Sequence, residues 1–194
     1  MPAHPDQVTS DVVLALHASP TQGSFVVTGA GSRYLSWLLG EAGSSGTVLD
    51  AQIPYAGHAL NDYLGHQPEQ NVSEATAIEM AEEAYWKALR LDALAHPDSI
   101  GERQIIGVAC TATIATNRVK RGEHRAHIAL RTATGAAASA VWLQKGLRDR
   151  SGEEEIVSRA MLIATAQAAG VENKIQLDLS ADDHYEEPHP VAGN

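Results

Sequence analysis

The sequence predicts an α/β protein in which strands and helices alternate along the chain and pack in layers. Three observations carry this prediction: short apolar runs rich in β-branched residues, longer segments with apolar residues at helical spacing, and small-residue turns that join them. A chain of 194 residues has the length of one domain and can bury a sizeable core without a disulfide or a metal. We therefore expect a single layered α/β domain over residues 1–171.

The first half of the chain begins with a short helix over 10–18, ended by a Ser-Pro pair. The run SFVVT at 24–28 is short, β-rich and apolar, which is typical of a strand buried on both faces of a sheet. A glycine-containing turn then leads into a helix capped by Ser32. A strand over 47–54, ended by its proline, and a short helical segment near 56–64 follow.

The second half begins with the longest predicted helix, over 74–94, behind a serine that can cap it and a glutamate that suits the helix dipole. The run QIIGVACT at 104–111 predicts another buried strand. Residues 125–132 and 139–145 predict a strand pair joined by a turn of small residues. The last helix is expected over 152–169, because acidic residues lead it and a glycine follows it.

The composition changes after Val171. Six acidic residues and one lysine follow, together with two prolines, so half of the chain's formal net charge of −10 lies in this segment. Such a composition favours little packed structure. We predict that residues 172–194 form an acidic, weakly ordered C-terminal tail.

The charge balance and the hydropathy exclude several classes of protein. A net charge of −10 argues against a nucleic-acid partner or an anionic membrane surface that would contact the whole protein. No stretch approaches roughly 18 uninterrupted apolar residues, and the N-terminus lacks the basic and apolar regions of a secretion signal. Cys110 is the only cysteine, which excludes a disulfide scaffold. The expected location is the cytoplasm.

The first candidate site is the turn at 28–32, between a buried strand and a helix N-terminus. Its glycines would let a ligand approach, and free helix N–H groups attract anions. The turn has neither the GxGxxG pattern nor the GK[ST] of a phosphate-binding loop. Two interpretations remain open: an anion site, or a tight turn that only needs small residues.

The second candidate site is a basic segment with a local charge of +4, opposed only by Glu123. Its five basic residues are Arg118, Lys120, Arg121, Arg125 and Arg131. Such clustering in an acidic protein favours a specific anionic ligand over a solvated face. Strand alternation places Arg125, His127 and Arg131 on one face, where a phosphate could be held.

Metal and cysteine chemistry are less well supported. The same alternation sends His124 and His127 to opposite faces, and no further ligand is evident, so we expect no metal. Cys110 lies in an apolar strand and is expected to be a small core residue. Glu153, Glu154 and Glu155 are expected to complement the helix dipole. No cofactor is expected.

The order of these segments resembles the C-terminal domain of the CinA family over residues 22–171. The resemblance rests on VTGAGSRYLSWLL, AGSS, IPY, YLG, NVSEATAIEMAEEA and CTATIAT, of which NVSEATAIEMAEEA is the most specific. HASPTQ, VTGAGS, CTATIAT, KRGEHRAHIA and RDRSGEEE further resemble the CinA-like domain that is sometimes fused ahead of a nucleotidyltransferase domain. The resemblance implies a three-layer α/β/α sandwich with a mostly parallel or mixed central sheet, a phosphorylated nucleotide ligand and a homo-oligomer, dimer or higher.

Typical CinA domains hydrolyse the carboxamide of nicotinamide mononucleotide without a metal, and the resemblance extends this activity to the present chain as an expectation. Thr28 aligns with the family's nucleophilic serine and Tyr55 with its assisting tyrosine, while Thr111 matches a threonine that contacts the amide or the phosphate. Leu60 stands where the family has its lysine, and leucine cannot act as a base. His58, two residues before Leu60, is a candidate substitute for that lysine that we do not favour.

Two hypotheses follow. In the first, the chain is an amidohydrolase with Thr28, Tyr55 and Thr111 as catalytic residues. The residues that would bind the substrate and its phosphate are Gly29, Ala30, Gly31, Ser32, Arg118, Lys120, Arg121, Arg125 and Arg150. In the second, the loss of the lysine at Leu60 leaves a catalytically impaired nucleotide-binding or regulatory module. A third option is an interaction protein on a borrowed fold.

Overall fold

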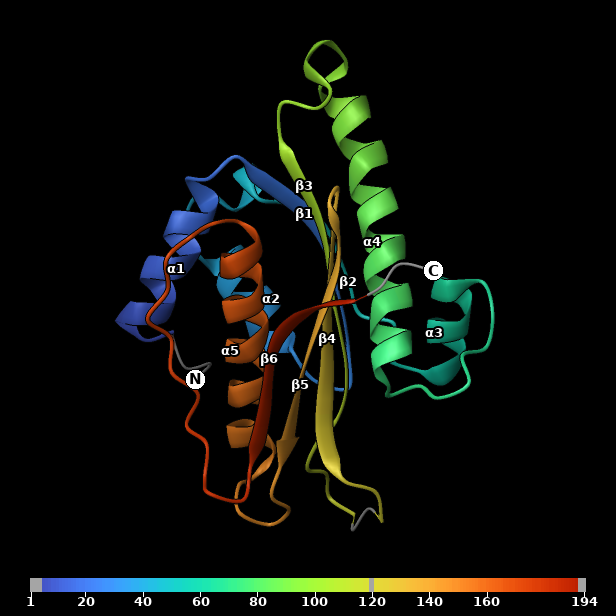
Figure 1. The fold of residues 1–194 in the computed structure, drawn as a ribbon, viewed down its shortest axis with the longest axis vertical. Coiled ribbons are helices and arrows are strands. Elements are labelled where there is room, and N and C mark those ends of the chain that lie inside the picture. The colour runs from blue at the N-terminus through green and yellow to red at the C-terminus, as the bar shows by residue number, and fades with distance from the viewer. Residues whose placement is uncertain (1–4, 119–120, 192–194) are drawn as a thin grey trace.

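A computed structural model describes residues 5–118 and 121–191. Within this part of the chain, one sheet holds the strands in the order β2-β1-β3-β4-β5-β6 (Figure 1). The strands are β1 (Thr21–Thr28), β2 (Val48–Gln52), β3 (Gln104–Thr113), β4 (His124–Thr132), β5 (Gly135–Leu143) and β6 (His184–Val191). The α-helices are α1 (Gln7–His17), α2 (Ser32–Gly40), α3 (Gly57–Leu64), α4 (Glu74–Ala95) and α5 (Arg150–Ala168), and the 3-10 turns are η1 (Ser44–Gly46) and η2 (Pro97–Ser99).

The sheet is mixed. β1 lies between β2 and β3 and is parallel to both, whereas β4, β5 and β6 add to the β3 edge as antiparallel strands. Parallel strands need a crossover, which the helical segments supply, while a turn of a few residues suffices between β4 and β5. The predicted α/β/α sandwich with a mixed sheet is confirmed.

Helices cover both faces of the sheet: α1, α2 and α5 lie on one side, and α3 and α4 on the other (Figure 1). Alternation along β1 divides its side chains between the two layers. Phe25 and Val27 are buried with α2 and α5, whereas Val26 is buried with Leu60 of α3 and Met80 of α4. Strand β1 is thus apolar on both faces, as the run SFVVT predicted.

Two helices begin earlier than predicted, because aspartates cap them. The side chain of Asp6 accepts the N–H of Thr9 at 2.9 Å at the start of α1. The side chain of Asp149 accepts the N–H of Gly152 at 2.8 Å at the start of α5. Each bond satisfies one of the donors that the first helical turn leaves open.

The acidic C-terminal segment differs from the prediction of a weakly ordered tail. Residues 184–191 form β6, which pairs with β5 along the edge of the sheet. Ile175, Leu177 and Leu179 pack against the core on the way to this strand. The prolines are compatible with β6 because an edge strand needs only one of its two rows of backbone donors. The prediction of weak order rested on the acidic composition, which carries no information about the pairing of β6 with β5.

Asp183 attaches this segment to the body of the protein. Its carboxylate accepts the N–H groups of Gln144 at 2.7 Å and Ser180 at 2.6 Å, and it pairs with Arg148 at 2.8 Å. Burial opposes ionisation of Asp183, but the hydrogen bonds from Arg148 and the backbone outweigh it and lower its pKa to about 2.

We expect Asp183→Asn to lower the free energy of unfolding at pH 7 by about 2 kcal/mol, the value of a carboxylate whose pKa falls by this amount on folding. A depressed pKa contributes fully above the unfolded value near 4, and the contribution disappears as pH falls towards 2. Urea unfolding at pH 7 and pH 3 tests this, with the exposed neighbour variant Asp182→Asn as the control. Equal losses in the two variants at pH 7 would contradict the assignment.

Candidate functional site

The parallel strands β1 and β3 end side by side, with Thr28 opposite Thr111 in register. Three segments meet at this end of the sheet: the turn after β1, the loop after β3 and the N-terminus of α5. The side chain of Arg150, from α5, donates hydrogen bonds to the turn after β1 and to the loop after β3. Ligand sites in α/β sheets commonly lie at the carboxyl ends of parallel strands. The turn at 28–32 and Arg118 of the basic segment lie near this end of the sheet, whereas Arg131 lies beside Gly107 of β3.

The turn after β1 is tight and packs closely against neighbouring backbone. Gly29 has a φ of +83°, and a Cβ there would lie 1.8 Å from the carbonyl oxygen of Ala112. Gly31 has a φ of +96°, and a Cβ there would lie 2.7 Å from the sulfur of Met161. Of the two interpretations left open by the sequence, the need for small residues explains both glycines without a ligand.

A carboxylate of the same chain already occupies the N-terminus of α2. Oε1 of Glu154 accepts the N–H of Gly31 at 2.9 Å, the hydroxyl of Ser32 at 2.9 Å and the N–H of Arg33 at 3.2 Å. Glu154 is buried and comes from the first turns of α5. The sequence analysis assigned Gly31 and Ser32 to phosphate binding. In this structure the N–H of Gly31 and the hydroxyl of Ser32 donate their hydrogen bonds to Glu154 instead. Ala30 between them is a buried core residue.

Of the three residues predicted to be catalytic, Thr28 and Thr111 lie in register on neighbouring strands, whereas Tyr55 lies on the segment after β2. Alternation places Thr28 on the sheet face that carries Val26 and α4, and its hydroxyl makes no hydrogen bond to the described residues. Thr111 is fully buried, and its hydroxyl donates to the carbonyl oxygen of Asn71. Tyr55 is 65% exposed and lies beyond the end of β2.

Leu60 is a core residue. It lies on α3 with 2% of its surface exposed and packs in the cluster that includes Met80 and Val26. A lysine at this position would have to bury its ammonium group among apolar side chains. His58, the proposed substitute, lies on the exposed start of the same helix.

Beside this edge of the sheet is a cavity of about 930 Å³, which we name the basic cavity. It is lined by Tyr55, Ala115, Thr116, Asn117, Arg118, His124, Lys145, Gly146, Arg148, Asp149 and Arg150. Four of the lining side chains are cationic: Arg118, Lys145, Arg148 and Arg150. One lining side chain, Asp149, is acidic. The cavity joins Tyr55, Arg118 and Arg150 from the predicted site residues, and it does not include Thr28 or Thr111.

The cations of the basic cavity are held to different degrees. Arg150 donates to the carbonyl oxygens of Gly29 at 3.0 Å and Ala115 at 3.1 Å, and so ties together the loops after β1 and β3. Lys145 donates to the carbonyl oxygen of Arg121 at 3.1 Å, and Arg148 pairs with Asp183 as described above. Arg118 is exposed and makes no hydrogen bond or ion pair with the described residues.

Arg125 and Arg131 of the basic segment do not line the basic cavity. Arg125 donates to the carbonyl oxygen of Val72 at 3.1 Å, and Arg131 pairs with Glu82 of α4 at 3.0 Å. Both lie on the α4 face of β4, as alternation predicted. Arg121 is exposed and does not line the cavity. Lys120 lies outside the described residues.

Sequence reasoning missed a buried pair at the cavity wall. Nδ1 of His124 lies 2.8 Å from Oε1 of Glu153, whose other oxygen accepts the N–H of Ala115 at 2.6 Å. His124 and His127 point to opposite faces of β4, as predicted, and no cluster of three or more metal-ligating side chains occurs in the described ranges. Twenty-nine positions separate the pair, so no local spacing reveals it.

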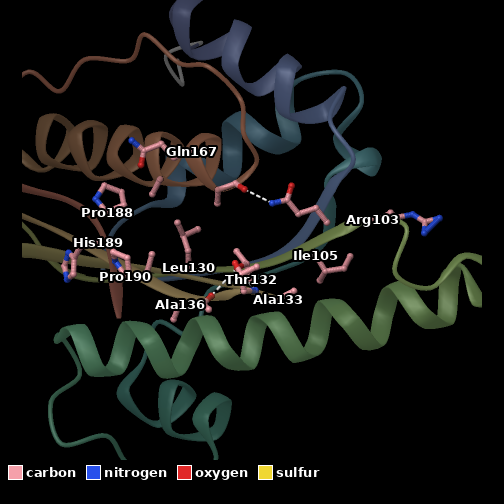
Figure 2. Close-up of a pocket in the computed structure, with 16 residues that line it drawn as sticks. Arg103, Ile105, Leu130, Thr132, Ala133, Ala136, Gln167, Pro188, His189 and Pro190 are labelled. Carbon is pink, nitrogen blue, oxygen red and sulfur yellow. Dashed lines mark hydrogen bonds between the residues drawn. The ribbon is translucent and has the colours of Figure 1, made fainter. Parts of the chain in front are cut away.

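A second cavity, of about 540 Å³, lies at the opposite end of the sheet, near the C-terminus of α5 (Figure 2). Its walls are mainly small or apolar side chains such as Leu130, Ala136 and Pro188. Gln104 donates to the carbonyl oxygen of Ala168 at 2.6 Å, and Arg103 pairs with Asp92 at 3.4 Å. Figure 2 shows the guanidinium of Arg103 directed away from the other lining residues. This cavity therefore offers little to an anionic ligand.

Solved structures share this fold. The competence/damage inducible protein CihA from Agrobacterium tumefaciens matches with a TM-score of 0.63 and 19% identity, over 87% of this chain and 99% of that one. A CinA superfamily protein from Enterobacter cloacae matches with a TM-score of 0.59 and 15% identity, over 86% and 96% of the two chains. The competence damage-inducible protein A from Klebsiella pneumoniae matches with a TM-score of 0.56 and 14% identity, over 82% and 95%.

No protein-family model and no curated protein sequence matches the chain. The structural likenesses confirm the CinA-like fold that the sequence motifs predicted, and the relation to domains fused with a nucleotidyltransferase stays a prediction. Within the described residues, no helix combines the length and the apolar character needed to cross a membrane.

Proposed function

We propose that this chain is a CinA-like nucleotide-binding module that takes a small phosphorylated nucleotide in the basic cavity. The observation that carries the proposal is the convergence of four cationic side chains on one cavity in a chain of net charge −10. A cavity in which cationic side chains outnumber acidic ones concentrates anionic ligands. Its volume of about 930 Å³ is sufficient for a mononucleotide.

The chemistry of the lining residues supports a ligand that has both a phosphate and a flat ring. The guanidinium of Arg118 makes no hydrogen bond or ion pair with the described residues, and an arginine can donate two parallel hydrogen bonds to a phosphate. Tyr55 exposes 65% of its surface, so its ring can stack on a base or a pyridine.

The same geometry supports binding more strongly than hydrolysis. The hydroxyl of Thr111 is committed to Asn71, Thr28 has no base among the described residues within hydrogen-bond distance, and Leu60 is in the core. The loss of a general base alone costs about 10²–10⁴-fold in rate. The proposal therefore follows the second hypothesis, an impaired module. A homo-oligomeric state, which rests on the family resemblance, and the cytoplasmic location expected from the sequence are parts of the same proposal.

Calorimetric titration with nicotinamide mononucleotide and with nicotinamide riboside, which lacks the phosphate, tests the proposal. We expect the mononucleotide to bind at least about tenfold more tightly, and Arg118→Ala to weaken its binding by about tenfold through the loss of a charge-assisted hydrogen bond. Arg90→Ala removes an exposed arginine of α4 outside the cavity and should change neither affinity. Equal affinity for the two probes would contradict a phosphate site.

Ammonia release from nicotinamide mononucleotide, measured on the same samples, separates binding from hydrolysis. We expect binding without ammonia above the background rate. Ammonia release that Thr28→Ala abolishes would replace this proposal with the amidohydrolase hypothesis.

A further inference from the structure

His124 and Glu153 form a buried pair in the wall of the basic cavity, and none of the proposed binding residues accounts for it. We propose that Nε2 of His124 donates a hydrogen bond to the anionic group of the ligand, and that Glu153 is the positioning residue that holds the ring for this contact. This inference rests on the proposed function and adds a residue to the same site.

Glu153 is suited to fix the ring. Its side chain is fully buried, and its two oxygens are both used, one by the N–H of Ala115 and the other by Nδ1 of His124. A buried carboxylate is stable only when it is paired and hydrogen-bonded, and the N-terminus of α5 adds its positive dipole end. An ionised Glu153 can only accept, and in that pairing Nδ1 of His124 is the donor.

With Nδ1 engaged, Nε2 is the ring atom left for the cavity. His124 lines the basic cavity, and its Nε2 makes no hydrogen bond to the described residues. Arg118, Lys145, Arg148 and Arg150 share this cavity, so the ligand group that they attract is an anion. An anionic oxygen accepts hydrogen bonds, so in the complex the ring carries protons on both nitrogens and bridges Glu153 and the ligand.

The contact is also preorganised by its neighbours. Ala115 donates its N–H to Glu153 and accepts Arg150 at its carbonyl oxygen, so one short loop fixes both the histidine and an arginine of the cavity. Groups held in this way lose little freedom when a ligand binds. A purely structural ion pair between α5 and β4 would not require His124 to line the cavity.

The test combines calorimetry with nitrogen NMR of the histidine rings, using nicotinamide mononucleotide and inorganic phosphate as probes. We expect both probes to shift the Nε2 resonance of His124 in the wild-type protein. His124→Gln should weaken binding of the mononucleotide by about tenfold or more, and binding of nicotinamide riboside by less than about twofold. His66→Gln is the matched control, because His66 also lies beside a glutamate, Glu79, but outside the cavity.

The outcomes separate this inference from the proposed function. If the mononucleotide binds while the His124 resonance and the affinity of His124→Gln stay unchanged, the inference is overturned and the proposed function stands. If neither probe binds the wild-type protein, both are overturned. If His124→Gln does not fold, the wild-type resonance shifts decide. In folded Glu153→Gln, the chemical shift of Nε2 should move towards that of a histidine ring without a carboxylate partner. This variant should also bind the mononucleotide more weakly.

Discussion

Replacing Gly29 with alanine is expected to cost about 4 kcal/mol or more of unfolding free energy, which is enough to abolish stable folding of many domains. Two independent causes add. The φ of +83° is unfavourable for any residue with a Cβ, and that Cβ would lie 1.8 Å from the carbonyl oxygen of Ala112. Backbone cannot move aside here, because Ala112 lies within the central strand β3.

Gly65→Ala is the matched control for this prediction. Gly65 has a φ of +75°, but a Cβ there would meet no atom within 4 Å, so only the conformational cost of about 1 kcal/mol remains. Chemical denaturation of both variants gives the difference, about 3 kcal/mol. Similar losses in the two variants would show that the loop after β1 can separate from β3. The turn would then be free to serve a ligand instead of packing.

The sequence could predict this turn but not what its donors contact. Strand, small residues and a capped helix follow from local patterns at 24–32, and the structure has each of them. The interpretation as a phosphate site required knowing what lies above the turn. Glu154, which lies there, is separated from Gly31 by 123 positions. A glutamate in the first turns of a helix also suits the helix dipole, so its local role conceals its distant one.

A similar limit applies to the other residues that sequence reasoning misjudged or missed. The family resemblance matches Leu60 to the position of a catalytic lysine. Its burial against Met80 results from the packing of α3 on α4, which the local sequence does not reveal. The sequence did not predict β6, because the composition of this segment is acidic and contains prolines. The strand forms through its long-range pairing with β5, which outweighs that composition. In each case the deciding contact joins residues far apart in the sequence, to which periodicity and capping signals are insensitive.

The second large effect is expected from Glu154→Ala, which should lower the free energy of unfolding by about 3 kcal/mol. The substitution leaves the buried N–H of Gly31, the half-buried N–H of Arg33 and the hydroxyl of the exposed Ser32 without their acceptor, and it removes a buried side chain. Glu155→Ala is the control, because Glu155 is 29% exposed and pairs with Arg33 and Arg159 near the surface, which is worth about 1 kcal/mol or less.

The same variant shows whether Glu154 takes the place of an anion. Removing the carboxylate leaves a helix N-terminus with converging donors, the arrangement that binds sulfate and phosphate. Sulfate should then raise the unfolding free energy of Glu154→Ala more than that of the wild type, with sodium chloride at equal ionic strength as the reference. If sulfate stabilises both proteins equally, Glu154 is only a structural cap. If the increment appears, the turn after β1 retains an anion site that α5 fills from within, so that an external phosphate is left with the basic cavity on the other side of Arg150.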